Sequence, residues 1–285
     1  MSYAMQPGYR LSTGGVSGEP RRGLQGVRLE VAARRAARGA AEEAARGDAV
    51  VFARERLGFT PDALQEAVLR GGKRGILNCS RQWGKTTVVS IKALHRAVYE
   101  PGSLILVASP GQARSAEMVR FVRQFAGRIG MPGLRGDGIH KASLVFPNGS
   151  RVVGLPARPA SVVGFSASLL IVDEAALVPD ELYDFLTPTL AATDGDCWLL
   201  STPNGMQGFF WQTWVKAGAD WTRIEAPASA CPRIRPEFLA REKERMPESR
   251  YRQFYCCEFT EREGAVFTRE AVERMFTDSE KAEEL

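Results

Sequence analysis

Residues 79–87 read C-S-R-Q-W-G-K-T-T, and this stretch decides the fold. A short apolar run at residues 75–78 precedes it, and residues 88–94, V-V-S-I-K-A-L, suit a helix that leaves the loop. A strand, a loop with Gly-Lys-Thr and a helix in this order are typical of a phosphate-binding P-loop. The backbone N–H groups of such a loop and the positive end of the helix dipole face the phosphates. The sequence therefore predicts that this chain binds a nucleotide.

The loop residues have distinct predicted roles. Lys85 can reach the β- and γ-phosphates and assist catalysis there, and the Thr86 hydroxyl can bind Mg²⁺. The pattern departs from the usual G-x-x-x-x-G-K-[ST], because Cys79 stands at the first glycine position. We expect the nucleotide to contact Ser80, Gln82, Gly84, Lys85, Thr86 and Thr87.

Downstream, residues 169–174 read L-L-I-V-D-E. Four apolar residues predict a buried parallel strand, and two acids follow at its carboxyl end, where open α/β sheets place their ligands. This is a Walker B pattern, in which Asp173 holds the Mg²⁺ shell and Glu174 orients or deprotonates the attacking water. The alternative is a strand that ends in a solvated acidic turn. The P-loop upstream favours the ATP site, with ATP and Mg²⁺ as its ligands.

Residues 59–65 read F-T-P-D-A-L-Q and lie just before the P-loop strand. Thr60 can cap a helix that has Pro61 in its first turn. An aromatic residue followed six residues later by Gln resembles the adenine-reading Q-motif of translocases. Phe59 can pack on the base, and the Gln65 amide can both donate to and accept from adenine. The alternative is an ordinary capped helix with an exposed Gln.

Composition excludes several classes of protein. The 285 residues are 44% hydrophobic and 25% charged, as in an ordinary soluble globular protein. No apolar run is long enough for a transmembrane helix, and the N-terminus lacks the apolar core of a signal peptide. Five cysteines without metal-ligand spacing predict neither a disulfide framework nor a zinc site, which fits a reducing cytoplasm. The net charge of +5 permits an acidic polymer as partner.

The chain alternates apolar strands with helical patterns, which predicts an α/β fold with a mostly parallel sheet. We expect a three-layer P-loop NTPase of the ASCE (RecA-like) class with a small helical lid. The predicted parts are a disordered arm (1–20), an Arg-rich helical segment (21–58), an ATPase core (59–225), a lid segment (226–267) and a tail (268–285). The arginines of the helical segment either touch nucleic acid or form a solvated face.

The chain resembles the ATPase domain of the large terminase subunit of tailed bacteriophages, the motor that packages DNA. The resemblance runs from about residue 59 to 267 and rests on four stretches: S-R-Q-W-G-K-T-T at 80–87, I-V-D-E-A-A at 171–176, L-S-T-P-N-G at 200–205, and E-F at 258–259 with G-A-V-F at 264–267. It implies that Arg81 is an internal arginine on the γ-phosphate. It also implies that Ser201, Thr202 and Asn204 sense this phosphate and couple hydrolysis to a moving subdomain.

Two departures from the family pattern matter. Terminases often carry Arg-Gly shortly before the Walker B aspartate as a finger for the neighbouring subunit, and residues 163–164 here read V-G. Arg158, or else Arg151, is the candidate substitute. The family's nuclease domain would follow residue 267, where residues 268–285 are too short for its fold. We expect no nuclease activity from this chain.

The resemblance implies an ATP-driven motor in the host cytoplasm, with double-stranded DNA, a portal protein, a small terminase subunit and further copies in a ring as partners. No membrane is expected. A helicase-like ATPase would need a second motor lobe, for which the chain has no room. The third interpretation is a nucleotide-binding assembly module that docks on a portal or a separate nuclease with little turnover of its own.

Overall fold

The computed structural model describes residues 20–156, 158–162 and 164–261. Its contacts divide the chain into two units, Met1–Ala44 and Ala45–Leu285, which are described separately. The described part of the first unit is helical and belongs to α1 (Pro20–Gly47). The second unit holds the sheet and the remaining described helices. The predictions for residues 1–19, Val163 and residues 262–285 lie outside the described part of the chain.

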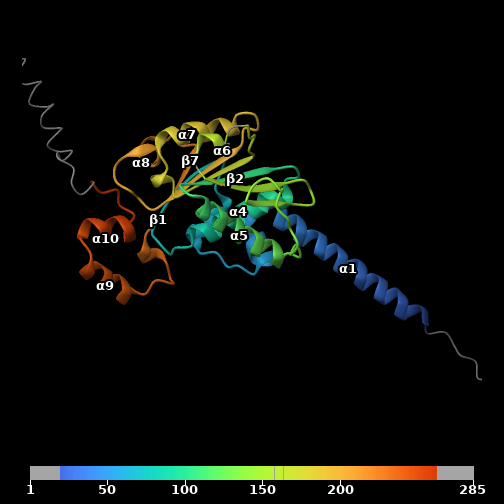
Figure 1. Cartoon of the computed structure of the whole chain (residues 1–285). Coiled ribbons are helices and arrows are strands. Elements are labelled where there is room, and N and C mark those ends of the chain that lie inside the picture. Colours follow the sequence, from blue (N-terminus) through green and yellow to red (C-terminus); the bar gives the residue numbers. More distant parts are fainter. Residues whose placement is uncertain (1–19, 157, 163, 262–285) are drawn as a thin grey trace, which may run out of the picture. The chain divides into compact units, whose positions relative to one another are not determined.

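The second unit is built on a seven-stranded sheet with the order β3-β4-β2-β5-β6-β1-β7 (Figure 1). All neighbouring strands pair in parallel except β3 and β4, which form an antiparallel hairpin. This confirms the predicted mostly parallel sheet. The strands are β1 (Arg74–Cys79), β2 (Leu104–Ser109), β3 (Ala142–Val145), β4 (Arg151–Pro156), β5 (Leu169–Asp173), β6 (Asp196–Ser201) and β7 (Trp221–Ala226).

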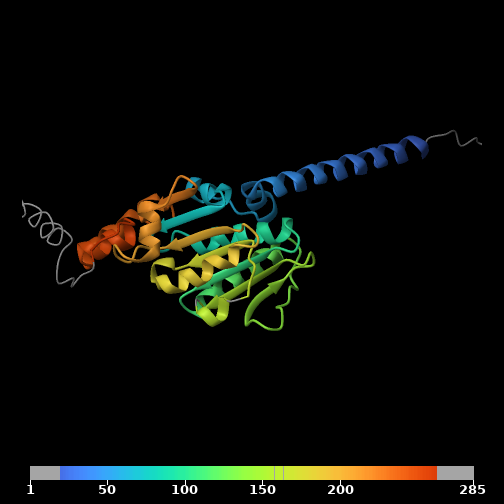
Figure 2. The same cartoon turned by 90° about the horizontal axis from the view of Figure 1, so that it is seen from above.

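Helices cover both faces of this sheet, which gives the predicted three layers (Figures 1 and 2). Helices α4 and α5 pack on one face, and α7 and α8 pack on the other. The helices are α2 (Ala49–Val51), α3 (Ala63–Arg70), α4 (Lys85–Tyr99), α5 (Gln112–Arg128), α6 (Pro159–Val162), α7 (Asp180–Leu186), α8 (Gly208–Lys216), α9 (Pro236–Arg245) and α10 (Glu248–Tyr255). Short helical turns occupy Phe52–Arg56, Ala175–Leu177, Thr187–Leu190 and Ala228–Ala230.

The apolar strands form because both faces of the sheet are covered. Strand β2 is buried at every position. Its side chains alternate between two cores: Ile105 and Val107 join the α4–α5 side, whereas Leu104 and Leu106 join the α7–α8 side. This alternation is the two-residue period of a strand, and burial of both sets explains why the sequence reads as a continuous apolar run.

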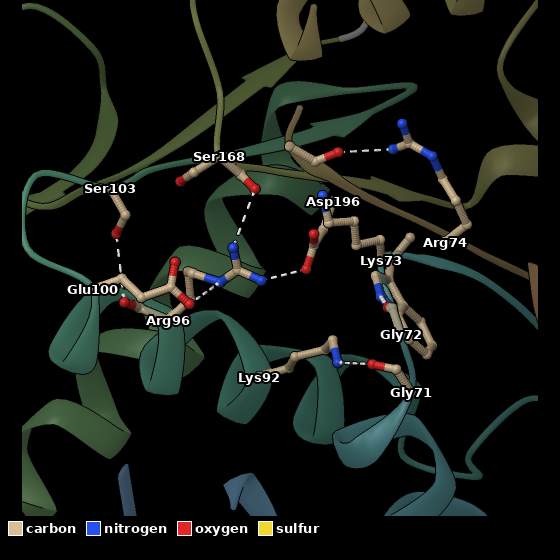
Figure 3. A network of polar contacts seen from close by, with 12 residues as sticks. Gly71, Gly72, Lys73, Arg74, Lys92, Arg96, Glu100, Ser103, Ser168 and Asp196 are labelled. Carbon is tan, nitrogen blue, oxygen red and sulfur yellow. Dashed lines mark hydrogen bonds and ion pairs between the residues drawn. The ribbon is translucent and has the colours of Figure 1, made fainter. Parts of the chain in front are cut away.

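A polar network fixes α4 at the end away from its N-terminus (Figure 3). The Lys92 ammonium donates to the carbonyls of Val68 and Leu69 at 3.2 Å and of Gly71 at 2.9 Å. Burial lowers the pKa of Lys92 to about 8. One turn later, Arg96 forms an ion pair with Asp196 at the start of β6. Together these contacts hold α4 to the end of α3 and to the sheet.

The lid segment follows β7 and is described as far as residue 261. It contains α9 and α10, which are joined by a hydrogen bond of 3.0 Å from the Tyr255 hydroxyl to Glu242. The segment returns to the core at Cys257, whose carbonyl accepts 2.7 Å from the Asn78 amide in β1. Among the described helices, none is both long and apolar enough to cross a membrane.

Candidate active site

The P-loop connects β1 to α4 through residues 80–84, as predicted from the sequence. Gly84 precedes the helix with φ of 103°, a left-handed conformation that favours glycine. A Cβ on Gly84 would also lie 3.3 Å from the Gln65 amide nitrogen and 3.4 Å from Arg233. Glycine at this position therefore meets both the backbone requirement and the tight packing.

The Trp83 carbonyl is where two separate segments hold the P-loop. The Trp83 ring is fully buried in the core. Its carbonyl oxygen accepts a hydrogen bond from Arg233 of the lid segment and a longer one, 3.5 Å, from the Gln65 side chain of α3. The loop conformation is thus linked to both the core and the lid segment.

Gln65 has a structural role that the sequence interpretation missed. The N-cap of α3 is Asp62 rather than Thr60, so the predicted cap was wrong. Asp62 accepts 2.9 Å from the Gln65 N–H, and the Gln65 side chain accepts 3.1 Å from the Asp62 N–H, which is a capping box. Gln65 is 2% exposed, and Phe59 packs partly buried against the core. Adenine recognition by this pair remains a prediction.

The Walker B residues lie at the carboxyl end of β5. Asp173 is its last residue, buried, and its carboxylate accepts 3.1 Å from the Glu174 N–H. Glu174 has φ of 53° and ψ of 43°, a conformation that is uncommon for a residue with a side chain. Such backbone strain is typical of functional sites.

The Glu174 carboxylate joins two cations from different elements. Lys85 lies 3.0 Å from Glu174 Oε1, and Arg114 of α5 donates to the same oxygen at 2.8 Å. The side chains of Lys85 and Glu174 are each only 14% exposed, whereas that of Arg114 is 55% exposed. Sequence reasoning missed Arg114. It reaches the site because β2, which precedes α5, lies next to β5 in the sheet.

Burial shapes the charges of this site. It raises the pKa of Asp173 to about 6, against the opposing effect of the Lys85 ammonium. Burial also works against the charged form of Lys85, but nearby acidic groups, Glu174 among them, raise its pKa overall. Lys85 therefore stays a cation at neutral pH, as phosphate binding requires.

The predicted coupling residues lie at the carboxyl end of β6, and two of them contact the P-loop strand and the Walker B turn. The Thr202 hydroxyl donates 2.9 Å to the Cys79 carbonyl, at the residue before the P-loop. The Asn204 amide donates 3.4 Å to the Ala176 carbonyl, in the turn after Glu174. Ser201 is fully buried, and its hydroxyl bonds to the Thr202 carbonyl at 2.9 Å. One short loop thus contacts the ends of two other strands.

A cavity of about 410 Å³ lies among these groups. The Arg81 guanidinium, on its wall, stacks 4.5 Å from the centre of the Phe254 ring of α10. The cavity is lined by Arg81, Gln82, Lys85, Arg114, Glu174, Leu177, Thr202, Pro203, Asn204, Gln253 and Phe254. Gln253 and Phe254 bring the lid segment into the site, which the sequence did not indicate.

The residues present fit ATP with Mg²⁺. The buried Ser80 hydroxyl has no hydrogen-bond partner among the described residues, so it is available to a phosphate oxygen. Asp173 and the hydroxyl of Thr86, at the start of α4, supply the oxygen ligands that Mg²⁺ prefers. Thr87 lies half-buried beside Thr86.

The two arginines considered as trans-acting cations flank β4 at its opposite ends. Arg158 is exposed and follows β4 at its carboxyl end, the edge where Asp173 also lies. Arg151 opens β4 at the other edge. Arg158 is therefore the better placed of the two.

Comparison with known proteins identifies the family. A family model described as "Terminase large subunit, T4likevirus-type, N-terminal" matches residues 76–274. The terminase large subunit of Thermus phage G20c is 24% identical over 263 residues, covering 75% of this chain and 52% of that protein. The chain spans about half the length of the curated relatives it matches.

Solved structures show the same fold. The ATPase domain of the Thermus phage P74-26 large terminase superposes with a TM-score of 0.65 at 23% identity, covering 73% of this chain and 97% of that domain. The large terminase of a thermophilic bacteriophage in complex with ADP gives 0.59 at 15% identity, covering 70% of this chain and 54% of that one. Because the family model covers well over half of the sequence, this chain belongs to the terminase large subunit family, in its N-terminal ATPase part.

Proposed function

We propose that this chain is the ATP-hydrolysing part of a motor that moves double-stranded DNA into a phage prohead. The observation that carries this proposal is the position of Glu174, which has a strained backbone and places its carboxylate at the wall of a cavity next to the P-loop. Lys85 lies within 3.0 Å of it. A general base and a phosphate-binding cation on one cavity are the parts that phosphoryl transfer to water needs.

Each residue has a defined task in this proposal. Backbone N–H groups of residues 81–86 and the Lys85 ammonium bind the phosphates, and Ser80 and Gln82 add side-chain contacts. Mg²⁺, held by Thr86 and Asp173, neutralises charge on the phosphates when it is bound. Glu174 then orients the attacking water. It can do so once Lys85 turns to the phosphates and Arg114 releases the carboxylate.

Arg81 supplies the internal cation for developing charge. A fixed guanidinium near the transferred phosphoryl group stabilises the transition state in a site from which water is excluded. In this structure Arg81 stacks on Phe254, so ATP must draw it away from the lid segment. Arg158 is the proposed second cation, provided in trans to a neighbouring copy in a ring.

Two places can receive the adenine base. The first is the predicted pair Phe59 and Gln65, beneath the loop. The second is a cavity of about 530 Å³ on the lid side, lined by Arg81, Gln82, Arg233, Ile234, Arg235, Phe238, Arg241 and Tyr255. Phe238 and Tyr255 give it aromatic surfaces that suit a base, and arginines line much of the rest. The substitutions Gln65→Ala and Phe238→Ala distinguish these two base sites. The site whose substitution removes the preference for ATP over GTP is the one that binds the base.

Coupling to movement runs through the loop after β6. Ser201, Thr202 and Asn204 connect the ends of β1 and β5, where the γ-phosphate lies in this proposal, to residues that adjoin the lid segment. A cavity that includes Asn204, Ser249 and Gln253 lies between this loop and α10. Loss of the γ-phosphate would thereby move the lid segment. The further proposed partners are a portal protein and a small terminase subunit, in the host cytoplasm.

The proposal is tested by phosphate release from the pure chain, with and without double-stranded DNA. Glu174→Gln should retain ATP binding and lower hydrolysis by roughly 10²-fold or more. Mixing Glu174→Gln with Arg158→Ala should restore some turnover through hybrid sites if Arg158 acts in trans. Undiminished hydrolysis in the Glu174→Gln chain would refute its role as the base.

A second function is favoured by one observation. The Glu174 carboxylate is shared by two cations in this structure, which restrains it from activating water. A chain that keeps this arrangement with ATP bound would act as a nucleotide-dependent assembly module with little turnover of its own. Rapid phosphate release by the isolated chain would exclude this alternative.

A further inference from the structure

Helix α1 presents an almost fully exposed surface. From residue 27 to residue 44 every residue is exposed except Glu42, which is half-buried. A helix gains most of its stability from packing an apolar face, and this part of α1 packs none. Its alanine content supports helix formation without such packing. Within its own unit, the surface of residues 27–41 is therefore open to a partner.

The charges on this helix are unevenly distributed. Residues 27–41 contain four arginines, and Glu30 is their one acidic residue. At about 100° per residue, the four arginines fall within an arc of roughly 120°. They are Arg28, Arg34, Arg35 and Arg38. We call them the arginine stripe. Alanines occupy most of the opposite side: Ala32, Ala33, Ala36, Ala37 and Ala40.

Within the described residues, the stripe has little neutralisation. Arg34 pairs with Glu30 at 2.6 Å, and both side chains are mostly exposed, so this pair contributes little. Arg28, Arg35 and Arg38 form no ion pair or hydrogen bond with any residue of the described part. Three guanidinium groups are thus free for an external anion.

We propose that the arginine stripe binds the phosphate backbone of double-stranded DNA. Arginine forms paired hydrogen bonds to phosphate, and a row of them fits a row of phosphates better than a single anion. The stripe runs from Arg28 to Arg38, about 15 Å along α1, which matches roughly four phosphate steps of one DNA strand. The alanine side carries one large apolar residue, Leu29, which is 72% exposed and is a small anchor for a protein groove. This inference rests on the proposed function, because it names a contact to the DNA that the motor moves.

The test is the salt dependence of DNA binding by the full chain, measured by fluorescence anisotropy with a duplex of about 30 bp. One variant replaces all four stripe arginines by Gln, and the matched control replaces them by Lys. Both are good helix formers, so α1 should persist, which circular dichroism checks. The Gln variant should bind weakly, with a log K against log salt slope smaller by roughly 0.9 for each phosphate that is no longer neutralised. The Lys variant should stay within several-fold of wild type.

Three outcomes would overturn the inference. The Gln variant could keep the wild-type slope of log K against log salt, or the Lys variant could lose as much DNA affinity as the Gln variant. Polyglutamate could also compete for the protein as strongly as DNA of equal charge. Basal phosphate release without DNA separates this inference from the proposed function. It should be the same in wild type and the Gln variant. Failure of ATP hydrolysis in both, with the slope difference intact, would refute the motor and leave the DNA contact standing.

Discussion

Asp173→Asn should make the protein more stable while removing its Mg²⁺-dependent function. The Asp173 carboxylate is 5% exposed, and burial raises its pKa from 3.8 to about 6. A difference of about two pH units corresponds to roughly 3 kcal/mol of unfavourable free energy for the charged form at neutral pH. Asn is neutral and keeps the oxygen that accepts the Glu174 N–H. For a unit of this size the gain corresponds to a rise in Tm of roughly 6–12 °C.

The effect should depend on pH with a defined sign. The pKa of Asp173 is higher in the folded protein than in the unfolded chain. Between about pH 4 and pH 6, Asp173 is therefore protonated more often in the folded protein than in the unfolded chain. The contribution of Asp173 to the free energy of unfolding therefore falls as the pH rises through this interval, and it stays unfavourable above it. The Asn variant lacks this loss, so its advantage should be small near pH 4 and full above about pH 7. Calorimetric unfolding at both ends of the range measures the difference.

Asp196→Asn is the matched control. Asp196 is also buried, but it forms an ion pair with Arg96, so its loss should destabilise the protein by roughly 1–3 kcal/mol. With MgATP added, wild type should gain Tm and Asp173→Asn should not. An Asp173→Asn protein that is less stable than wild type above pH 7, or whose advantage does not change with pH, would refute burial as the cause.

Three further substitutions probe the same cavity. Lys85→Ala should lower ATP affinity at least tenfold in a fluorescent-nucleotide titration, and normal binding would remove the P-loop assignment. Arg114→Ala removes one cation from Glu174, and because the Arg114 side chain is 55% exposed, this pair contributes about 0.5–1 kcal/mol. Basal phosphate release should therefore rise by roughly two- to fivefold; a fall would show that Arg114 contributes to catalysis. Phe254→Leu frees Arg81 from a cation–π contact of about 0.5–1 kcal/mol and should tighten ATP binding up to about fivefold. The control Phe254→Tyr keeps an aromatic ring beside Arg81 and should leave the ATP affinity unchanged.

The sequence predicted those parts of the fold that depend on local pattern. Buried strands such as β5 are continuous apolar runs, and the motifs at their ends mark the edge where the site lies. Strand β7 was not predicted, because it is an edge strand in which Arg223 and Glu225 are exposed. Its pairing with β1 depends on contacts distant in the chain. An edge strand carries a weaker apolar pattern than a central one.

The same reason explains the gaps in the predicted site. Arg114 follows a turn with no motif of its own, and only the pairing of β2 with β5 brings it to Glu174. Phe254 enters through the fold of the lid segment. For Gln65 the sequence did carry a signal, because Asp62 and Gln65 have the spacing of a capping box. Because proline is common in the first turn of a helix, Pro61 favoured Thr60 as the cap, which was wrong.

The anchoring of α4 sets a limit on how the molecule can move. The helix carries the P-loop lysine at its first residue, and Lys92 and Arg96 tie its later turns to α3 and β6. An element held this way opens only when much of the structure opens. In hydrogen exchange, the amides of α4 should stay protected in the apo, ATP-bound and ADP-bound states alike. The amides of residues 203–207 and 228–261 should change their exchange rates with the bound nucleotide. The core then stays rigid while the lid segment moves relative to it.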